Sequence, residues 1–171
     1  MAGRRAERFW LFLFFSFVLP LPLKAATVSF LVLEAGRDAV AADSHSLLWE
    51  GSLLDVFFEE GHIVSNAPIQ SLSSPVGSFS MTNPAQFPRE VLREYNAARS
   101  GGSDFFILAL LDYQGTIEGE RPKSVALRLF KIAANEFLGE TRYTGGASGS
   151  RPDETAAMKN TIKNLLSRLK N

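Results

Sequence analysis

Two apolar runs constrain the fold of this chain more than any other feature of its sequence. Residues 27–33 read TVSFLVL and residues 105–111 read FFILALL. A strand with one solvated face alternates apolar and polar residues, whereas a strand buried on both faces reads as a nearly continuous apolar run. Both runs therefore predict strands covered on two sides, and 105–111 is expected to be the innermost. Such strands are typical of α/β proteins, in which helices pack on both faces of a sheet.

The residues between these runs predict a βαβ unit. Asp43, Ser44 or Ser46 can cap a helix, and Gly61 is suited to end it. The apolar residues of this helix cover an arc of about 200° at about 100° per residue, so the helix lies against a sheet or meets a partner. Residues 62–65 (HIVS) then predict a short second strand. This order is typical of a right-handed crossover between parallel strands.

The second half of the chain predicts two more helices and a strand meander. One helix starts at Pro84 or, because of Pro88, somewhat later, and two glycines at 101–102 end it. Strands are expected at 124–132 and at 137–144, the second at a sheet edge because it carries charged residues on its outward face. A glycine-rich hinge then leads into the last helix.

These elements predict an α/β fold with a mixed β-sheet of about five strands and three helices, in the order β-α-β-α-β-β-β-α. Residues 27–171 are expected to form a single domain. A domain of this length can bury about two thirds of its unfolded surface, so it needs no covalent staple. The sequence contains no cysteine, which excludes disulfides, thiolate metal sites and a catalytic thiol.

The first 26 residues predict a signal peptide. Arginines precede an apolar run at 9–23, and Lys24-Ala25-Ala26 follows it. A helix of that length spans roughly 22 Å, short of the hydrocarbon core of about 30 Å. Cleavage is expected after Ala25 or Ala26, with a retained anchor as the alternative. The protein is therefore predicted to be exported, to the periplasm of a bacterium with two membranes and otherwise to the exterior.

The charge distribution argues against nucleic acid as a partner. The 171 residues contain 18 Lys and Arg and 18 Asp and Glu. The basic surplus lies in the first 26 residues, so the remaining body is mildly acidic. Such a body lacks the basic surface that nucleic acid requires.

Few residues offer chemistry, and no cofactor or metal is predicted. His45 is expected to be a solvated surface residue and His62 a structural one, since no motif pairs them with other ligands. The carboxylates Asp112, Glu118 and Glu120 follow the innermost strand. They are interpreted as part of a solvated hairpin, with acid–base catalysis as the alternative.

The segment 66–88 is the candidate binding region. It is rich in proline and serine and longer than most structureless loops, which are usually functional or disordered at such lengths. Its scattered apolar residues either cover a sheet edge or form a docking strip. The predicted partner-binding residues are Ile69, Leu72, Val76, Phe79 and Met81.

Two short motifs carry a resemblance to a known group of proteins. The helix end and strand at 57–64 (FFEEGHIV) and the Gly-x-Asp-Phe sequence at 102–105 precede a second helix and a meander, respectively. In this the body resembles the small envelope domains related to the TolB amino-terminal domain, CsgG and LpoB. The resemblance covers about residues 27–170, but the chain lacks a lipidated cysteine. It implies a non-enzymatic adaptor of the cell envelope.

The sequence therefore favours an exported, non-enzymatic binding domain that contacts another envelope protein. The 66–88 segment, an exposed strand edge, or both would provide the surface. The first alternative is a periplasmic domain that binds a small molecule or a cell-wall fragment. The second is a hydrolase that uses the carboxylates after the innermost strand.

Overall fold

A computed structural model describes residues 25–37, 42–75, 77, 81–116, 121–144 and 151–170 of the chain. Its strands are β1 (Thr27–Ala35), β2 (Ile63–Asn66), β3 (Gln70–Leu72), β4 (Phe105–Asp112), β5 (Ser124–Lys131) and β6 (Glu136–Thr144). Its helices are α2 (Ser44–Glu59), α3 (Arg89–Ser100) and α4 (Arg151–Leu166), with short 3-10 turns η3 (Pro84–Gln86) and η4 (Ser167–Lys170). None of these helices is long and apolar enough to cross a membrane.

The strands form one mixed sheet in the order β2-β1-β4-β5-β6, and β3 pairs with the carboxyl-terminal part of β1. Strands β2, β3 and β4 all run parallel to β1, whereas β5 and β6 complete an antiparallel meander. Strand β4 lies between β1 and β5, which confirms the prediction that residues 105–111 form an innermost strand.

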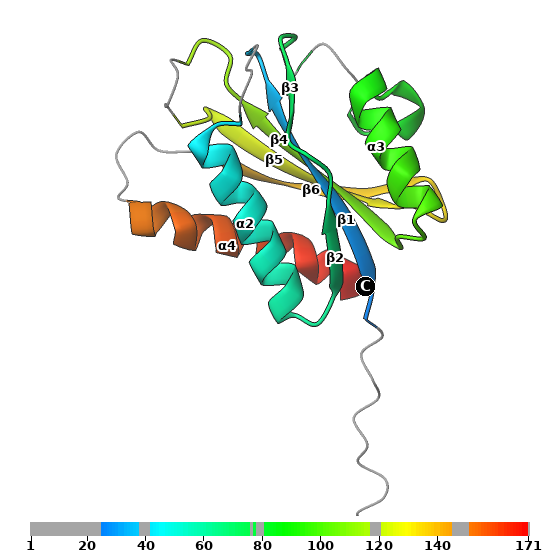
Figure 1. The fold of residues 1–171 in the computed structure, drawn as a ribbon. Helices are drawn as coiled ribbons and strands as arrows, with labels where there is room; N and C mark the ends of the chain where they lie inside the picture. The colour runs from blue at the N-terminus through cyan, green and yellow to red at the C-terminus, as the bar shows by residue number, and fades with distance from the viewer. Residues whose placement is uncertain are drawn as a thin grey trace, which may run out of the picture.

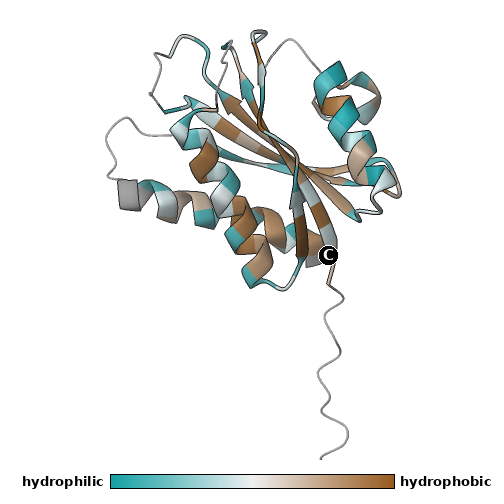
Figure 2. Ribbon diagram, viewed as in Figure 1, coloured by the Kyte–Doolittle hydropathy of each residue, from teal (hydrophilic) through white to brown (hydrophobic). Residues whose placement is uncertain are grey.

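Helices cover both faces of the sheet, as the apolar strands require. Helices α2 and α4 lie side by side on one face, and α3 lies on the other (Figure 1). Alternate residues of β1 supply the two core clusters: Phe30 and Val32 face α2 and α4, while Leu31 and Leu33 face α3. Figure 2 shows hydrophobic residues along the strands between these layers.

On the α3 face of the sheet, part of β5 and β6 carries polar side chains. Arg128 of β5 is buried there and bonds to Glu140 of β6, which also bonds to Arg142. Burial tends to raise the pKa of Glu140, but hydrogen bonds and charge from the two arginines lower it below its ordinary value. Glu140 and Arg142 lie on β6, which is an edge strand, as the sequence predicted.

The predicted α/β class and the order of the main elements are confirmed, with one addition. The segment 66–88 contains strand β3 and the turn η3, so it is more ordered than the sequence indicated. Asn83 caps the short turn η3, and α3 begins only at Arg89, so the later of the two predicted starts is the one observed. The predicted hinge at 145–150 lies outside the described residues.

Gly36 fixes how β1 ends. Its φ is +83°, and a Cβ atom there would lie 2.8 Å from the backbone of Gln114. Its N–H donates to the carbonyl of Leu72, which ties the end of β1 to the end of β3. Only glycine combines this left-handed conformation with such a close backbone approach.

We predict that Gly36→Ala lowers the free energy of unfolding by about 1–3 kcal/mol, because it combines an unfavourable φ with a backbone clash. The matched control is Gly51→Ala in the middle of α2, where a Cβ atom meets nothing within 4 Å. That variant should stabilise the protein by about 0.5–1 kcal/mol through helix propensity. Urea unfolding followed by the fluorescence of buried Trp49 measures both. An unchanged Gly36→Ala midpoint would contradict the account of Gly36.

Candidate functional site

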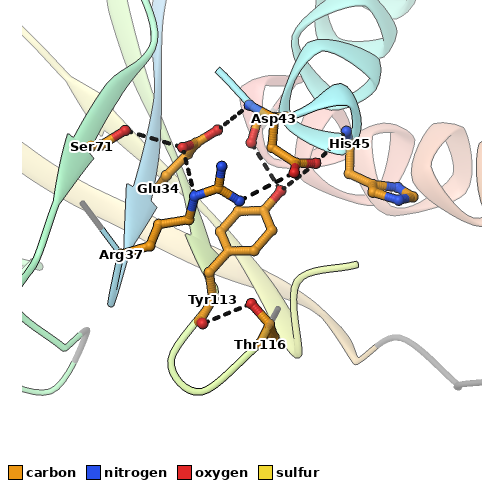
Figure 3. A network of polar contacts seen from close by, with 8 residues as sticks. Glu34, Arg37, Asp43, His45, Ser71, Tyr113 and Thr116 are labelled. Carbon is orange, nitrogen blue, oxygen red and sulfur yellow. Dashed lines mark hydrogen bonds and ion pairs between the residues drawn. The ribbon is translucent and has the colours of Figure 1, made fainter. Parts of the chain in front are cut away.

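A polar network lies where β1 and β4 end, at the carboxyl edge of the parallel strands (Figure 3). This is the edge at which open α/β sheets usually bind ligands. Its centre is Glu34, the fully buried penultimate residue of β1. The Glu34 carboxylate accepts hydrogen bonds from the Asp43 N–H at 2.8 Å and from the Ser71 hydroxyl at 3.0 Å. Its Oε2 also lies 3.4 Å from Nε of Arg37.

Asp43 joins this network to the start of α2. Its carboxylate caps the helix by accepting the His45 N–H at 2.8 Å, and it pairs with Nη1 of Arg37 at 3.1 Å. The buried Tyr113 hydroxyl lies 3.0 Å from the Ser46 hydroxyl and donates to Asp43 at 3.4 Å. The Arg37 guanidinium lies over the Tyr113 ring, 4.6 Å from its centroid, which is a cation–π contact.

The electrostatics of the network favour a structural role. Burial alone would raise the pKa of Asp43, but the His45 N–H and the Arg37 charge lower it below its ordinary value. Burial raises the pKa of Tyr113 far above its usual range, so the phenol stays protonated and cannot act as a base at neutral pH. The two carboxylates are engaged by Arg37 and by main-chain and hydroxyl donors. The network therefore clamps the ends of β1, β3 and β4 to the start of α2.

This network was not predicted from the sequence because its members come from distant segments. Glu34 and Arg37 directly follow the predicted strand at 27–33, and Ser71 lies in the segment 66–88. The available signal was a glutamate directly after a strand that is apolar on both faces. Such a carboxylate must be buried, and a buried charge requires partners.

The expectation that His45 is a solvated surface residue is wrong. Its side chain is largely buried, and its Nδ1 lies 3.3 Å from the carboxylate of Glu154 in the first turn of α4. Arg121 contacts the other oxygen of the same carboxylate at 3.0 Å. The reason is the packing of α4 against α2, which a reading of local sequence does not reveal.

The remaining candidates are placed as follows. His62 has the structural environment expected of it: its Nδ1 lies 3.4 Å from the Ala26 nitrogen, and its ring contacts Phe57. Asp112 is half-buried, and its carboxylate accepts the Gln114 N–H at 3.0 Å, as in a turn. Glu118 and Glu120 lie outside the described residues. No group of three or more potential metal ligands occurs among the residues that the structure describes.

Three of the five predicted partner-binding residues can be placed. Ile69 and Leu72 are half-buried and pack on opposite core clusters. Met81 is only 2% exposed and belongs to the cluster under α3. Val76 and Phe79 lie outside the described residues. A binding role for these five residues stays a prediction.

Exposed apolar side chains concentrate on α2 instead. Leu47 is 53% exposed and Phe58 is 71% exposed. At about 100° per residue, both lie on one line along the helix with Gly51 and the half-buried Leu54. We call these four residues the α2 ridge. The ridge points away from the buried face of α2, which Trp49 and its neighbours pack against the sheet.

Strand β2 offers a second accessible feature. It pairs with β1 on one side and stands at the end of the sheet. The main-chain N–H groups of Ile63 and Ala67 donate toward β1. Because these groups alternate along a strand, the N–H groups of Val64 and Asn66 point to the outer edge. Ile63 is 62% exposed.

Two cavities also lie on the part of the surface that the structure describes. One of about 370 Å³ lies between α3 and the start of β1, and its floor includes a chain of hydroxyls. Ser29 lies 2.6 Å from Ser65 and 2.7 Å from Ser103, oxygen to oxygen. The other cavity, of about 440 Å³, surrounds Ala25 and Ala26 at the start of β1.

We predict that Asp43→Asn lowers the free energy of unfolding by about 1 kcal/mol at pH 7, since asparagine keeps the helix cap but loses the charge facing Arg37. A lowered carboxyl pKa stabilises the fold above the unfolded value of 3.8, and this contribution is lost as the pH falls through the folded value. The difference between wild type and variant should therefore shrink below about pH 4.

Tyr113→Phe is the matched control for this pH dependence. It removes the hydroxyl contacts to Ser46 and Asp43. It removes no group that titrates between pH 3 and pH 7, because the ordinary pKa of tyrosine is about 10. Chemical unfolding at several pH values compares the three proteins. An Asp43→Asn difference that stays constant with pH would contradict the charged pair.

Comparison with known proteins supplies similarities of fold. No model of a known protein family matches the sequence, and no curated protein does. The structure is similar to the PelC dodecamer of Paraburkholderia phytofirmans, with 14% identity, a TM-score of 0.45, and coverage of 85% of this chain and 87% of that chain. It is also similar to TolB of Acinetobacter baumannii, with 10% identity and a TM-score of 0.42, over 84% of this chain but 28% of TolB.

A lipoprotein of Neisseria meningitidis is a third similar structure, with 14% identity, a TM-score of 0.39, and coverage of 83% of this chain and 96% of that chain. TolB, whose amino-terminal domain the sequence resembles, is thus one of these similar structures.

Proposed function

We propose that this chain is an exported, non-enzymatic binding domain of the cell envelope that holds a partner protein on the α2 ridge. The observation that carries the proposal is the exposure of Leu47 and Phe58 on one line of a helix that is otherwise packed against the sheet. Export is proposed from the arginines, the apolar run and the small residues that precede Ala26.

The shape of the ridge suits a helix. Its four positions follow the spacing i, i+4, i+7 and i+11, which forms one stripe along α2. Gly51, near its middle, has open space above it, so a partner's backbone can approach closely there. Burial of a phenylalanine or leucine side chain contributes about 1.5–3 kcal/mol, so the two exposed side chains can contribute substantially to binding.

The side chains beside the ridge are acidic, which favours a basic partner. Glu50 lies on one side of the stripe, and Asp55 and Glu59 lie on the other. Helix α2 contains no lysine or arginine. An acidic border favours lysine and arginine on the opposing surface and repels acidic ones. The proposed partner therefore presents an amphipathic helix with basic residues beside its apolar stripe.

A labelled synthetic peptide tests the ridge directly. The probe is an 18-residue helix with leucines at the ridge spacing and lysines beside them, and its twin carries glutamates in place of the lysines. We expect the lysine peptide to bind, with weaker binding at high salt, and the glutamate peptide not to bind. Phe58→Asp should weaken binding at least about ten-fold, which corresponds to about 1.4 kcal/mol. Fluorescence anisotropy measures both peptides.

Ile63→Asp is the matched control, because the exposure of Ile63 lies between those of Leu47 and Phe58 but Ile63 lies on β2. Its binding of the lysine peptide should equal that of the wild type. Equal binding by Phe58→Asp would contradict a site on the ridge.

The outer edge of β2 is a second candidate surface, and the predicted residues in 66–88 adjoin it in sequence. A partner strand can add to an edge whose N–H and C=O groups point outward. In-cell photocrosslinking from position 58 or from position 66 distinguishes the two surfaces. We expect a reproducible protein adduct from position 58.

Val64→Pro provides the control for the edge. It removes an outward N–H and none of those directed at β1, so the fold should tolerate it. The proposal would be contradicted if an adduct formed from position 66 and not from position 58, and if Val64→Pro abolished it. The partner would then bind at the edge of β2 and not at the α2 ridge.

A further inference from the structure

The start of β1 is held by main-chain and side-chain groups from two other segments. The Thr27 N–H donates to the carboxylate of Asp104 at 2.9 Å, and the Asp104 N–H donates to the Thr27 carbonyl at 2.8 Å. The Ala26 carbonyl accepts the Ile63 N–H at 3.0 Å. The Ala26 nitrogen lies 3.4 Å from Nδ1 of His62. These contacts therefore hold Ala26 and Thr27 in place.

The cavity of about 440 Å³ at this point has an acidic lining. Its walls include the carboxylates of Glu60 and Asp104 and the imidazole of His62, with Lys131 as the one basic side chain among the described lining residues. Ala25 and Ala26 of the chain's own N-terminal segment also line the cavity.

The two cleavage positions that the sequence left open would leave different contacts at the start of β1. Ala25 is exposed, whereas Ala26 is half-buried and packs against the core cluster under α2. Cleavage after Ala26 would remove the carbonyl that accepts the Ile63 N–H. Cleavage after Ala25 would keep every one of the contacts described above and would turn the Ala26 nitrogen into an ammonium group.

We propose that the mature chain begins at Ala26 and that its α-ammonium group binds in this acidic cavity, with His62 as hydrogen-bond acceptor and Asp104 as the nearby counter-charge. An α-amino group has an ordinary pKa of about 7.7–8.0, so it is charged at neutral pH. Hydrolysis of the peptide bond between Ala25 and Ala26 consumes one water and releases the signal peptide with a free carboxylate. Removal of the signal thus adds a charge that stabilises the attachment of β1.

This inference rests on the proposed export but not on the α2 ridge. Its first test is mass spectrometry of the N-terminal peptide of the exported protein. A first residue of Ala26 is expected. A first residue of Thr27, or an uncleaved N-terminus, would overturn the proposal.

The second test neutralises the new charge in the exported protein itself. Acetic anhydride near pH 6.5 acetylates the α-amine in preference to lysine, whose ordinary pKa of about 10.4 keeps it protonated. Acetylation keeps an N–H donor but removes the charge. We expect the acetylated protein to melt a few degrees lower, as followed by the fluorescence of Trp49.

In the Asp104→Asn variant, the difference in melting temperature between the free and the acetylated protein should be much smaller. Asp112→Asn is the matched control, because Asp112 accepts a main-chain N–H in the same way at the opposite end of β4. The control should leave the difference unchanged. Equal melting temperatures of the free and acetylated forms, or a difference that survives Asp104→Asn, would overturn the role of Asp104. Peptide binding to the α2 ridge should be unaffected by acetylation, which separates this test from that of the proposed function.

Discussion

The rest of the structure depends on the need to bury β1 and β4 on both faces. Alternate residues of β1 supply two separate core clusters, so neither face can be left to water. Apolar area removed from water contributes about 25 cal/mol per Å². A helix pair on one face and a single helix on the other meet this requirement, and the loops then follow from the connections between these layers.

The two-sided core also determines where charge can be placed. At the carboxyl ends of β1 and β4 the strands leave the cover of the helices, and Glu34, Arg37 and Asp43 pair with one another there. On the α3 face of β5 and β6, Arg128 and Glu140 pair in the same way. In both places the buried charges at the boundary of the core are paired with opposite charges. Removing one partner of such a pair costs about 3–5 kcal/mol, because the other charge stays buried without a partner.

The sequence predicted those features that depend on local pattern. Continuous apolar runs identified β1 and β4, and the cap at Asp43 and the stop at Gly61 located α2. Contacts between distant segments could not be predicted in the same way. Glu34 meets Ser71 across 37 residues, and His45 meets Glu154 only because α4 packs on α2. Strand β3 was missed because three residues among prolines and serines carry too little pattern. The apolar arc of the first helix indicated either a sheet contact or a partner, and the exposures of Leu47 and Phe58 are consistent with both.

The register of β1 has a consequence for the order of folding. Strand β1 is the first element of the domain, yet its hydrogen-bonded neighbour β4 follows much later, and Thr27 and Asp104 are 77 residues apart. Contacts between such distant residues form slowly, because a long loop must close before they stabilise anything. A chain that emerges amino end first, from a ribosome or through a membrane pore, therefore stays unfolded until more than half of the domain has passed. The topology thus delays folding during transit.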